Sequence, residues 1–185
     1  TQKPSSAASD VYKRQPGYQF LHCLVNEANG GLSSVVDGFA VANYLKKNEK
    51  NVFNILTKTY VKFKDTDYTQ KAVRILHSPI ITLTKDNDFN DIRFSMAAMG
   101  AVDVDPKKMK KFYDAYQYFA SLLQNKKFKI DFRLEAGDIF CFNNRRVLHG
   151  RTEFDPNSGN RHLQGYYIER DEIIGRLNYF NNIKV

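Results

Sequence analysis

The stretch from Gly137 to Arg161 constrains the fold more than any other part of the sequence. Its first apolar run, Asp138–Phe142, ends at the polar turn Asn143–Asn144, and a second run ends at His149–Gly150. A loop rich in turn-forming residues then leads to Arg161, where a further strand begins. Short apolar runs separated by turns predict consecutive β-strands.

Two residues of this stretch have side chains suited to binding chemistry. His149 stands where a strand gives way to glycine, so its imidazole can reach a metal ion or a substrate at a barrel mouth. Arg161 follows 12 residues later and could hold a carboxylate by two parallel hydrogen bonds. Taken alone, His149 is also explained as the histidine of a capped turn, and the spacing to Arg161 favours a ligand.

The other segments predict further strands and flanking helices. Tyr18–Asn26 is mostly apolar and predicts a buried strand. Asp37 or Gly38 opens a helix that ends at Lys46–Lys47. The remaining expected elements are the helix Asn51–Thr59 and the strands Tyr60–Lys64, Ala72–Leu76, Pro79–Thr84, Asp91–Met96 and Phe128–Arg133.

The longest predicted helix is Pro106–Asn125. Asp105 is a suitable N-cap, and Pro106 suits the first helical position. We expect the helix to pack against the outside of a barrel through an apolar stripe. The stripe consists of Phe112, Tyr116, Phe119 and Leu123.

Length and composition indicate one globular domain. The 185 residues include 14 Phe and 11 Tyr, enough for a sizeable core. The two cysteines, Cys23 and Cys141, have no neighbouring metal ligands, which predicts reduced, buried thiols in an intracellular protein. No apolar run approaches the roughly 20 residues that span a bilayer, so we expect no membrane insertion.

The net charge of +8 raises the question of nucleic-acid binding. The basic residues form short, separate clusters without a nucleic-acid-binding motif. These clusters are Lys107–Lys111, Lys126–Lys129 and Arg145–Arg151. Solvated faces explain them better, so we expect no nucleic-acid partner.

Two motifs carry a family resemblance. GDxxxFxNxRxLHGR at Gly137–Arg151 and RHLxGxY at Arg161–Tyr167 resemble the iron(II)/2-oxoglutarate dioxygenases of the TauD-like type. The resemblance runs from about Pro16 to the C-terminus, so residues 16–185 are expected to be the C-terminal part of such a domain. It implies a mainly β fold with flanking helices, a double-stranded β-helix or jelly roll. The nearest members hydroxylate gamma-butyrobetaine in carnitine biosynthesis, and those that hydroxylate trimethyllysine are the alternative.

The resemblance also implies ligands. Such enzymes hold Fe(II) with two histidines and one carboxylate, and His149 matches the distal histidine. Arg161 matches the residue that clamps the far carboxylate of 2-oxoglutarate, and Ser33 matches a residue that contacts the same carboxylate. For Ser33, a turn serine is the alternative. Tyr167 matches an aromatic residue that cages a trimethylammonium substrate. The family implies ascorbate and a homodimer, and we expect a cytoplasmic rather than a mitochondrial protein.

Part of the family pattern is missing. A His-x-Asp iron motif would lie before Leu21, within residues 1–15, which instead resemble a non-native or disordered leader. No histidine of the sequence begins a His-x-Asp; the four are His22, His77, His149 and His162. Ser95–Met99 replaces an Asn-rich stretch and leaves the exact substrate open. We therefore expect a dioxygenase fragment that is inactive alone, with a non-catalytic small-molecule binder as the alternative.

Overall fold

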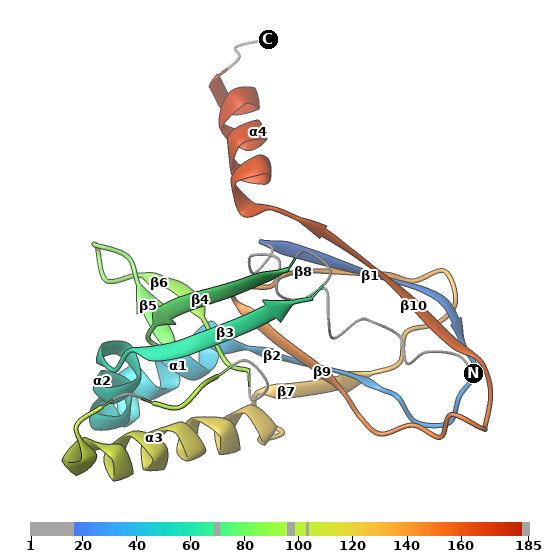
Figure 1. Ribbon diagram of the computed structural model, residues 1–185. Helices are drawn as coiled ribbons and strands as arrows, with labels where there is room; N and C mark the ends of the chain where they lie inside the picture. Colours follow the sequence, from blue (N-terminus) through green and yellow to red (C-terminus); the bar gives the residue numbers. More distant parts are fainter. Residues whose placement is uncertain (1–16, 69–70, 96–98, 103, 183–185) are drawn as a thin grey trace. The chain divides into compact units, whose positions relative to one another are not determined.

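The computed structural model describes residues 17–68, 71–95, 99–102 and 104–182. The predicted leader, residues 1–15, lies outside the described residues. Contacts divide the chain into two compact units. Their helices and strands are labelled in Figure 1. Unit 1 comprises residues 1–34, 131–145 and 149–185, and unit 2 comprises 35–130 and 146–148. The assignment of residues 16–185 to a single domain stays a prediction.

Unit 1 contains a three-stranded antiparallel sheet in the order β10-β1-β8. Its central strand, β1 (Tyr18–Asn26), has the predicted bounds. β8 (Ile139–Asn143) pairs with one edge of β1, and β10 (Arg161–Ile168) pairs with the other. Two distant segments of the sequence motif therefore lie on either side of one strand.

A second three-stranded sheet has the order β7-β2-β9. It consists of β7 (Lys129–Phe132), β2 (Ser33–Asp37) and β9 (Val147–Arg151). Each of these strands has residues in both units. Ser33 begins β2 and His149 is central in β9, so two of the predicted site residues belong to this sheet.

Aromatic rings follow one another along unit 1. The ring centroids of Phe132 and Phe140 lie 5.1 Å apart, and those of Phe140 and Phe142 lie 5.0 Å apart. Phe142 is buried, whereas Cys141 is exposed. The prediction that both cysteines are buried is thus wrong for Cys141, because strand alternation places it on the same side as the exposed Ile139.

Helices form much of unit 2. α1 (Gly38–Asn48) begins at the predicted place, where the carboxylate of Asp37 accepts hydrogen bonds from the backbone of Phe39 and Ala40. α2 (Lys50–Lys58) follows directly. α3 (Pro106–Gln124) has the predicted N-cap, since the Asp105 carboxylate accepts from the Lys107 amide at 2.9 Å.

The apolar stripe of α3 contributes to the core of unit 2. Phe112, Phe119 and Leu123 are buried as predicted, and Tyr116 is half-buried. Within unit 2, α3 packs against α1 and α2. The expected contact of this helix with the outside of a barrel stays a prediction.

Two hairpins complete unit 2. β3 (Val61–Asp67) pairs with β4 (Ala72–Ser78), and β5 (Ile81–Leu83) pairs with β6 (Phe89–Ile92). The predicted strand Asp91–Met96 is displaced, since β6 begins and ends earlier and Met96 lies outside the described residues. The ring of Phe94 instead stacks on Tyr116, with 4.9 Å between centroids.

The C-terminal helix α4 (Arg170–Asn182) was not expected from the sequence. It has no buried residue, so its sequence lacks the apolar stripe by which helices are recognised. None of the helices in the described part of the chain is long and apolar enough to cross a membrane.

Candidate functional site

His149 lies in unit 1 against the aromatic row. The centroids of its imidazole and the Phe142 ring are 4.7 Å apart. Although the residue is exposed, the surrounding protein removes enough water to lower the pKa of its imidazole. His149 is therefore neutral at neutral pH, which leaves a ring nitrogen able to bind a metal ion.

Arg161 begins β10 with its side chain half-buried. Its guanidinium carbon lies 5.6 Å from the centroid of the Phe154 ring. Gly31 approaches from the other end of the sequence, and a Cβ there would lie 3.1 Å from Nε of Arg161 and 3.2 Å from Cβ of Phe154. Gly31 also has φ +67°, so its lack of a side chain suits both the backbone conformation and the close approach.

The surroundings of Arg161 carry an excess of positive charge. Burial lowers the pKa of its guanidinium, and the charges of Arg151 and Arg133 lower it further. Arg151 lies over the same ring, 4.4 Å from the Phe154 centroid. Within the described part of the chain, the buried Nε of Arg161 has no hydrogen-bond acceptor. This arrangement favours an incoming carboxylate.

Arg133 fixes the loop that leads to Gly31 and Ser33. Its guanidinium donates to the carbonyl of Ala28 at 3.1 Å and to that of Gly30 at 3.3 Å. It also donates to the carbonyl of Asn26 at the end of β1. The Arg133 side chain thus donates to three backbone carbonyls before Gly31, and Gly31 in turn lies against Arg161.

Ser33 is buried at the start of β2. The preceding residue, Leu32, exchanges hydrogen bonds with Thr152: its amide donates to the Thr152 hydroxyl at 2.9 Å, and its carbonyl accepts from the Thr152 amide at 3.0 Å. These bonds place Ser33 beside the strand that carries His149. Its contact with 2-oxoglutarate stays a prediction.

Tyr167 lies on β10 opposite Gln19 of β1. It shares a strand face with Arg161, as the sequence predicts, because both side chains are half-buried and Tyr167 is six positions, an even number, further along the strand. A Cβ on Gly165 would lie 3.5 Å from the Tyr167 hydroxyl oxygen, an ordinary van der Waals distance, so the ring packs beside this glycine. The structure therefore brings all four predicted site residues into unit 1, each with its own neighbours.

The described residues do not form a complete iron site. Nowhere in the described ranges do three or more His, Cys, Asp or Glu side chains gather in a way that could hold a metal ion. The neutral imidazole of His149 fits one ligand position, and the other two have no candidate there.

Three residues of the site were not recognised from the sequence: Gly31, Arg133 and Phe154. The contacts of Gly31 with Arg161 and of Arg133 with the loop before Gly31 join segments that are far apart along the chain, whereas Phe154 lies seven positions before Arg161. Phe154 offered one usable signal, since it is an aromatic residue in an otherwise polar loop between two strands. Arg133 and Gly31 offered none.

Comparison with curated proteins finds relatives over most of the chain. The gamma-butyrobetaine dioxygenase of Pseudomonas sp. (strain AK-1) is 41% identical over 163 residues, which are 88% of this chain and 42% of that protein. The human gamma-butyrobetaine dioxygenase is 37% identical over 88% of this chain and 43% of its own length. A trimethyllysine dioxygenase of Meyerozyma guilliermondii is 30% identical over 90% of this chain and 42% of its own length. The chain thus spans less than half the length of these relatives.

A solved structure confirms the fold class. Asparagine oxygenase, in a complex with Fe(II), 2S,3S-3-hydroxyasparagine and succinate, matches 87% of this chain and 48% of its own with a TM-score of 0.66. The identity is 19%, so this similarity concerns the fold alone. The predicted TauD-like jelly roll with flanking helices is therefore correct. The family model "Taurine catabolism dioxygenase TauD, TfdA family" matches residues 6–167, and the chain belongs to this family.

Proposed function

We propose that this chain is part of an Fe(II)- and 2-oxoglutarate-dependent dioxygenase that hydroxylates gamma-butyrobetaine in carnitine biosynthesis. In such a protein, His149 would be one ligand of the iron, which supplies the oxidising chemistry when bound. The remaining ligands would come from residues that this sequence does not contain. Arg161 and Ser33 would bind the distal carboxylate of 2-oxoglutarate.

The environment of Arg161 carries the proposal. A half-buried guanidinium with an unpaired Nε, repelled by two other arginines, is arranged to receive an anion. It stands where the dioxygenase motif expects the carboxylate clamp. The 41% identity with a gamma-butyrobetaine dioxygenase supports the same assignment.

Tyr167 is proposed to contact the trimethylammonium group of the substrate. It lies on the same face of β10 as Arg161, six residues further on, about 20 Å along a straight strand. Twist would shorten this span and leave space for cosubstrate and substrate between the two side chains. An aromatic face attracts a quaternary ammonium ion by about 1–2 kcal/mol when water is excluded.

Two alternatives remain distinct. Trimethyllysine carries the same headgroup, and the 30% identity with a trimethyllysine dioxygenase favours it less than the first assignment. A non-catalytic small-molecule binder is favoured by the lack of a second iron ligand among the described residues. The first alternative predicts hydroxylated trimethyllysine as the product, and the second predicts no product.

The decisive experiment expresses the protein with its native upstream sequence. Succinate formation is measured with Fe(II), 2-oxoglutarate and either gamma-butyrobetaine or trimethyllysine. We expect substrate-dependent succinate with gamma-butyrobetaine, several-fold weaker substrate binding in Tyr167→Leu and near-normal binding in Tyr167→Phe. Equal affinities of the Leu variant and the wild type would remove Tyr167 from the substrate site.

The chain of 185 residues is the matched control. Because it holds one iron ligand, we expect no iron-dependent succinate formation from it alone. Turnover by this chain would mean that the metal site is completed by groups we have not identified.

Ascorbate, a homodimer and a cytoplasmic location are further parts of the proposal. The first two follow from the family resemblance, and the location is consistent with two free cysteines. Dependence of turnover on ascorbate and sedimentation of the full-length protein test the first two, and fractionation of cells tests the third.

A further inference from the structure

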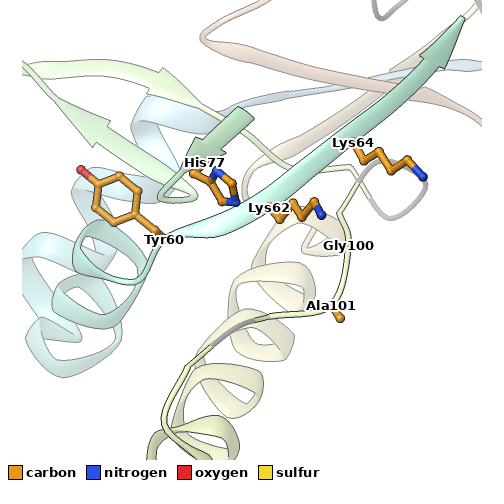
Figure 2. Close-up of a pocket in the computed structure, with 6 residues that line it drawn as sticks. All are labelled: Tyr60, Lys62, Lys64, His77, Gly100 and Ala101. Atoms are coloured by element: carbon orange, nitrogen blue, oxygen red, sulfur yellow. The ribbon is translucent and has the colours of Figure 1, made fainter. Parts of the chain in front are cut away.

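An open cavity of about 530 Å³ lies on unit 2, beside the hairpin of β3 and β4. Its volume is within the range of small-molecule sites. Three of its six lining residues have side chains that carry nitrogen. The lining consists of Tyr60, Lys62, Lys64, His77, Gly100 and Ala101 (Figure 2).

The nitrogen-bearing side chains share one face of the hairpin. Lys62 and Lys64 are two residues apart on β3, so their side chains lie on the same face and their Cα atoms are about 7 Å apart. His77 of β4 lies directly opposite Lys62 in the strand register. Figure 2 shows both lysine side chains extending in the same direction from β3, with His77 beside Lys62. Flexible lysine side chains can therefore bring both ammonium groups to one small ligand.

The opposite wall is held close to this face. The amide of Gly100 donates to the carbonyl of Lys62 at 2.8 Å, and Phe63 and Met99 form a β-bridge. A Cβ on Gly100 would lie 3.4 Å from the Lys62 carbonyl oxygen. The segment of Gly100 and Ala101 is thus fixed against β3 by backbone contacts.

Among the described residues, no acidic side chain lines the cavity. Lys62 is half-buried, and Lys64 is exposed. In the described residues, no hydrogen bond or ion pair occupies either ammonium group. Like charges on one strand face repel each other, and a bound anion would turn this repulsion into attraction to the ligand.

We propose that this cavity binds a small oxyanion, a carboxylate or phosphate group, through Lys62, Lys64 and His77. The ammonium groups neutralise its charge and donate hydrogen bonds to its oxygens. The imidazole adds a donor from the neighbouring strand. The backbone of Gly100 and Ala101 limits the width of the ligand, which selects compact anions.

The experiment titrates the isotope-labelled chain with inorganic phosphate and, separately, with succinate. Ionic strength is kept constant with sodium chloride so that general screening does not change. We expect saturable shifts at the backbone amides of Lys62, His77, Gly100 and Ala101. Saturation by phosphate alone, by succinate alone or by both supports the site and identifies its preferred anion. Saturation by neither overturns it.

Charge variants locate the binding. Lys62→Gln combined with Lys64→Gln should weaken the binding at least ten-fold. The matched control combines Lys108→Gln with Lys111→Gln, which removes the same charge from exposed positions of α3 and should change the affinity less than two-fold. Wild-type affinity in the first double variant would overturn the proposal.

A second pair of variants leaves both lysines in place, so it decides the question even if the first double variant does not fold. Ala101 is exposed at the rim. Ala101→Glu adds a carboxylate that should abolish anion binding, whereas Ala101→Gln adds the same bulk without charge and should bind at least ten-fold better than the Glu variant. Equal binding by the two variants would contradict the site.

Discussion

Arg161 has the properties of an anchor for an anion because, among the described residues, its buried Nε has no hydrogen-bond acceptor. Gly31 and Phe154 enclose its side chain, and Arg151 adds a second positive charge over the Phe154 ring. The side chain is held in place chiefly by shape and by the aromatic face. The N–H groups of its guanidinium can therefore donate hydrogen bonds to a ligand.

Replacing Arg161 should affect 2-oxoglutarate before anything else. A charged, two-pronged contact is worth roughly 1.5–3 kcal/mol, so Arg161→Ala in the full-length protein should raise the 2-oxoglutarate requirement ten-fold or more. Arg161→Lys should rescue only part of this loss because one ammonium cannot reproduce the fork. Kinetics and calorimetric titration with 2-oxoglutarate measure both effects. An unchanged requirement in the Ala variant would end the assignment.

Phe154 should act through Arg161 rather than on the ligand. Phe154→Leu keeps apolar bulk but removes the ring face, which is worth about 0.5–1 kcal/mol at a partly exposed site. We expect KM for 2-oxoglutarate in the full-length protein to rise about two- to five-fold with little change in kcat. Phe154→Tyr keeps the ring and is the control. A Leu variant with wild-type KM would show that the ring does not position the guanidinium.

Local signals identified some residues and missed others. Asp37 and Asp105 were recognised as N-caps because capping depends on the next few residues only. The close approach of Gly31 to Arg161 depends on pairing between segments more than 100 positions apart. Phe154 lies only seven positions before Arg161, but it stands in a loop without regular periodicity. Periodicity and spacing carry no information about such contacts.

The start of α1 combines two stabilising roles in one carboxylate. Asp37 caps the helix and accepts a hydrogen bond from Nε of Arg146 at 3.0 Å. Burial opposes its charge, but the hydrogen bond and the charge of Arg146 outweigh burial, so the pKa of Asp37 lies below its ordinary value. The chain therefore fastens the first turn of α1 to the turn before β9.

The lowered pKa of Asp37 sets the sign of a pH effect. The unfolded chain takes up the proton first, so the stabilisation is present above the ordinary carboxyl pKa of about 3.9 and is lost as the pH falls through the lower folded value. Asp37→Ala should cost about 0.5–2 kcal/mol at pH 7 through the lost cap alone.

Denaturant titrations at pH 7 and pH 3 measure this difference. The stability gap between wild type and Asp37→Asn, which keeps a capping oxygen, should narrow at pH 3. Asp114→Asn is the control, since Asp114 pairs with Lys110 on an exposed helix face, where ion pairs contribute little. A gap independent of pH would contradict the role assigned to the Asp37 charge.

Most elements were predictable, but their limits and partners were less so. The strand Tyr18–Asn26 and the helix from Pro106 follow from apolar patterns and caps. The displaced β6 shows a limit, because the stacking of Phe94 on Tyr116 is a contact with a distant helix. The helix α4 was missed because none of its residues is buried.

The chain as a whole contains part of what the proposed reaction needs. Unit 1 holds the four residues assigned to ligands, and His149 is the described residue that we propose as an iron ligand. The family and the fold followed from two motifs of the sequence, and the solved structure and the relatives agree with both. No histidine of the sequence begins a His-x-Asp, and the inactivity of this chain alone stays a prediction.

Because α4 has no buried residues, its amide hydrogens should exchange rapidly with heavy water. A helix of 13 residues that buries none of them is marginal in water, whereas α3 has 19 residues and five of them are buried. Amides of α4 should therefore exchange at nearly the rates of an unstructured peptide, while those of α3 should wait for unit 2 to open. Mass spectrometry of exchanged peptides from the two helices compares them directly. Slow exchange in α4 would instead mean that another chain or segment covers it in solution.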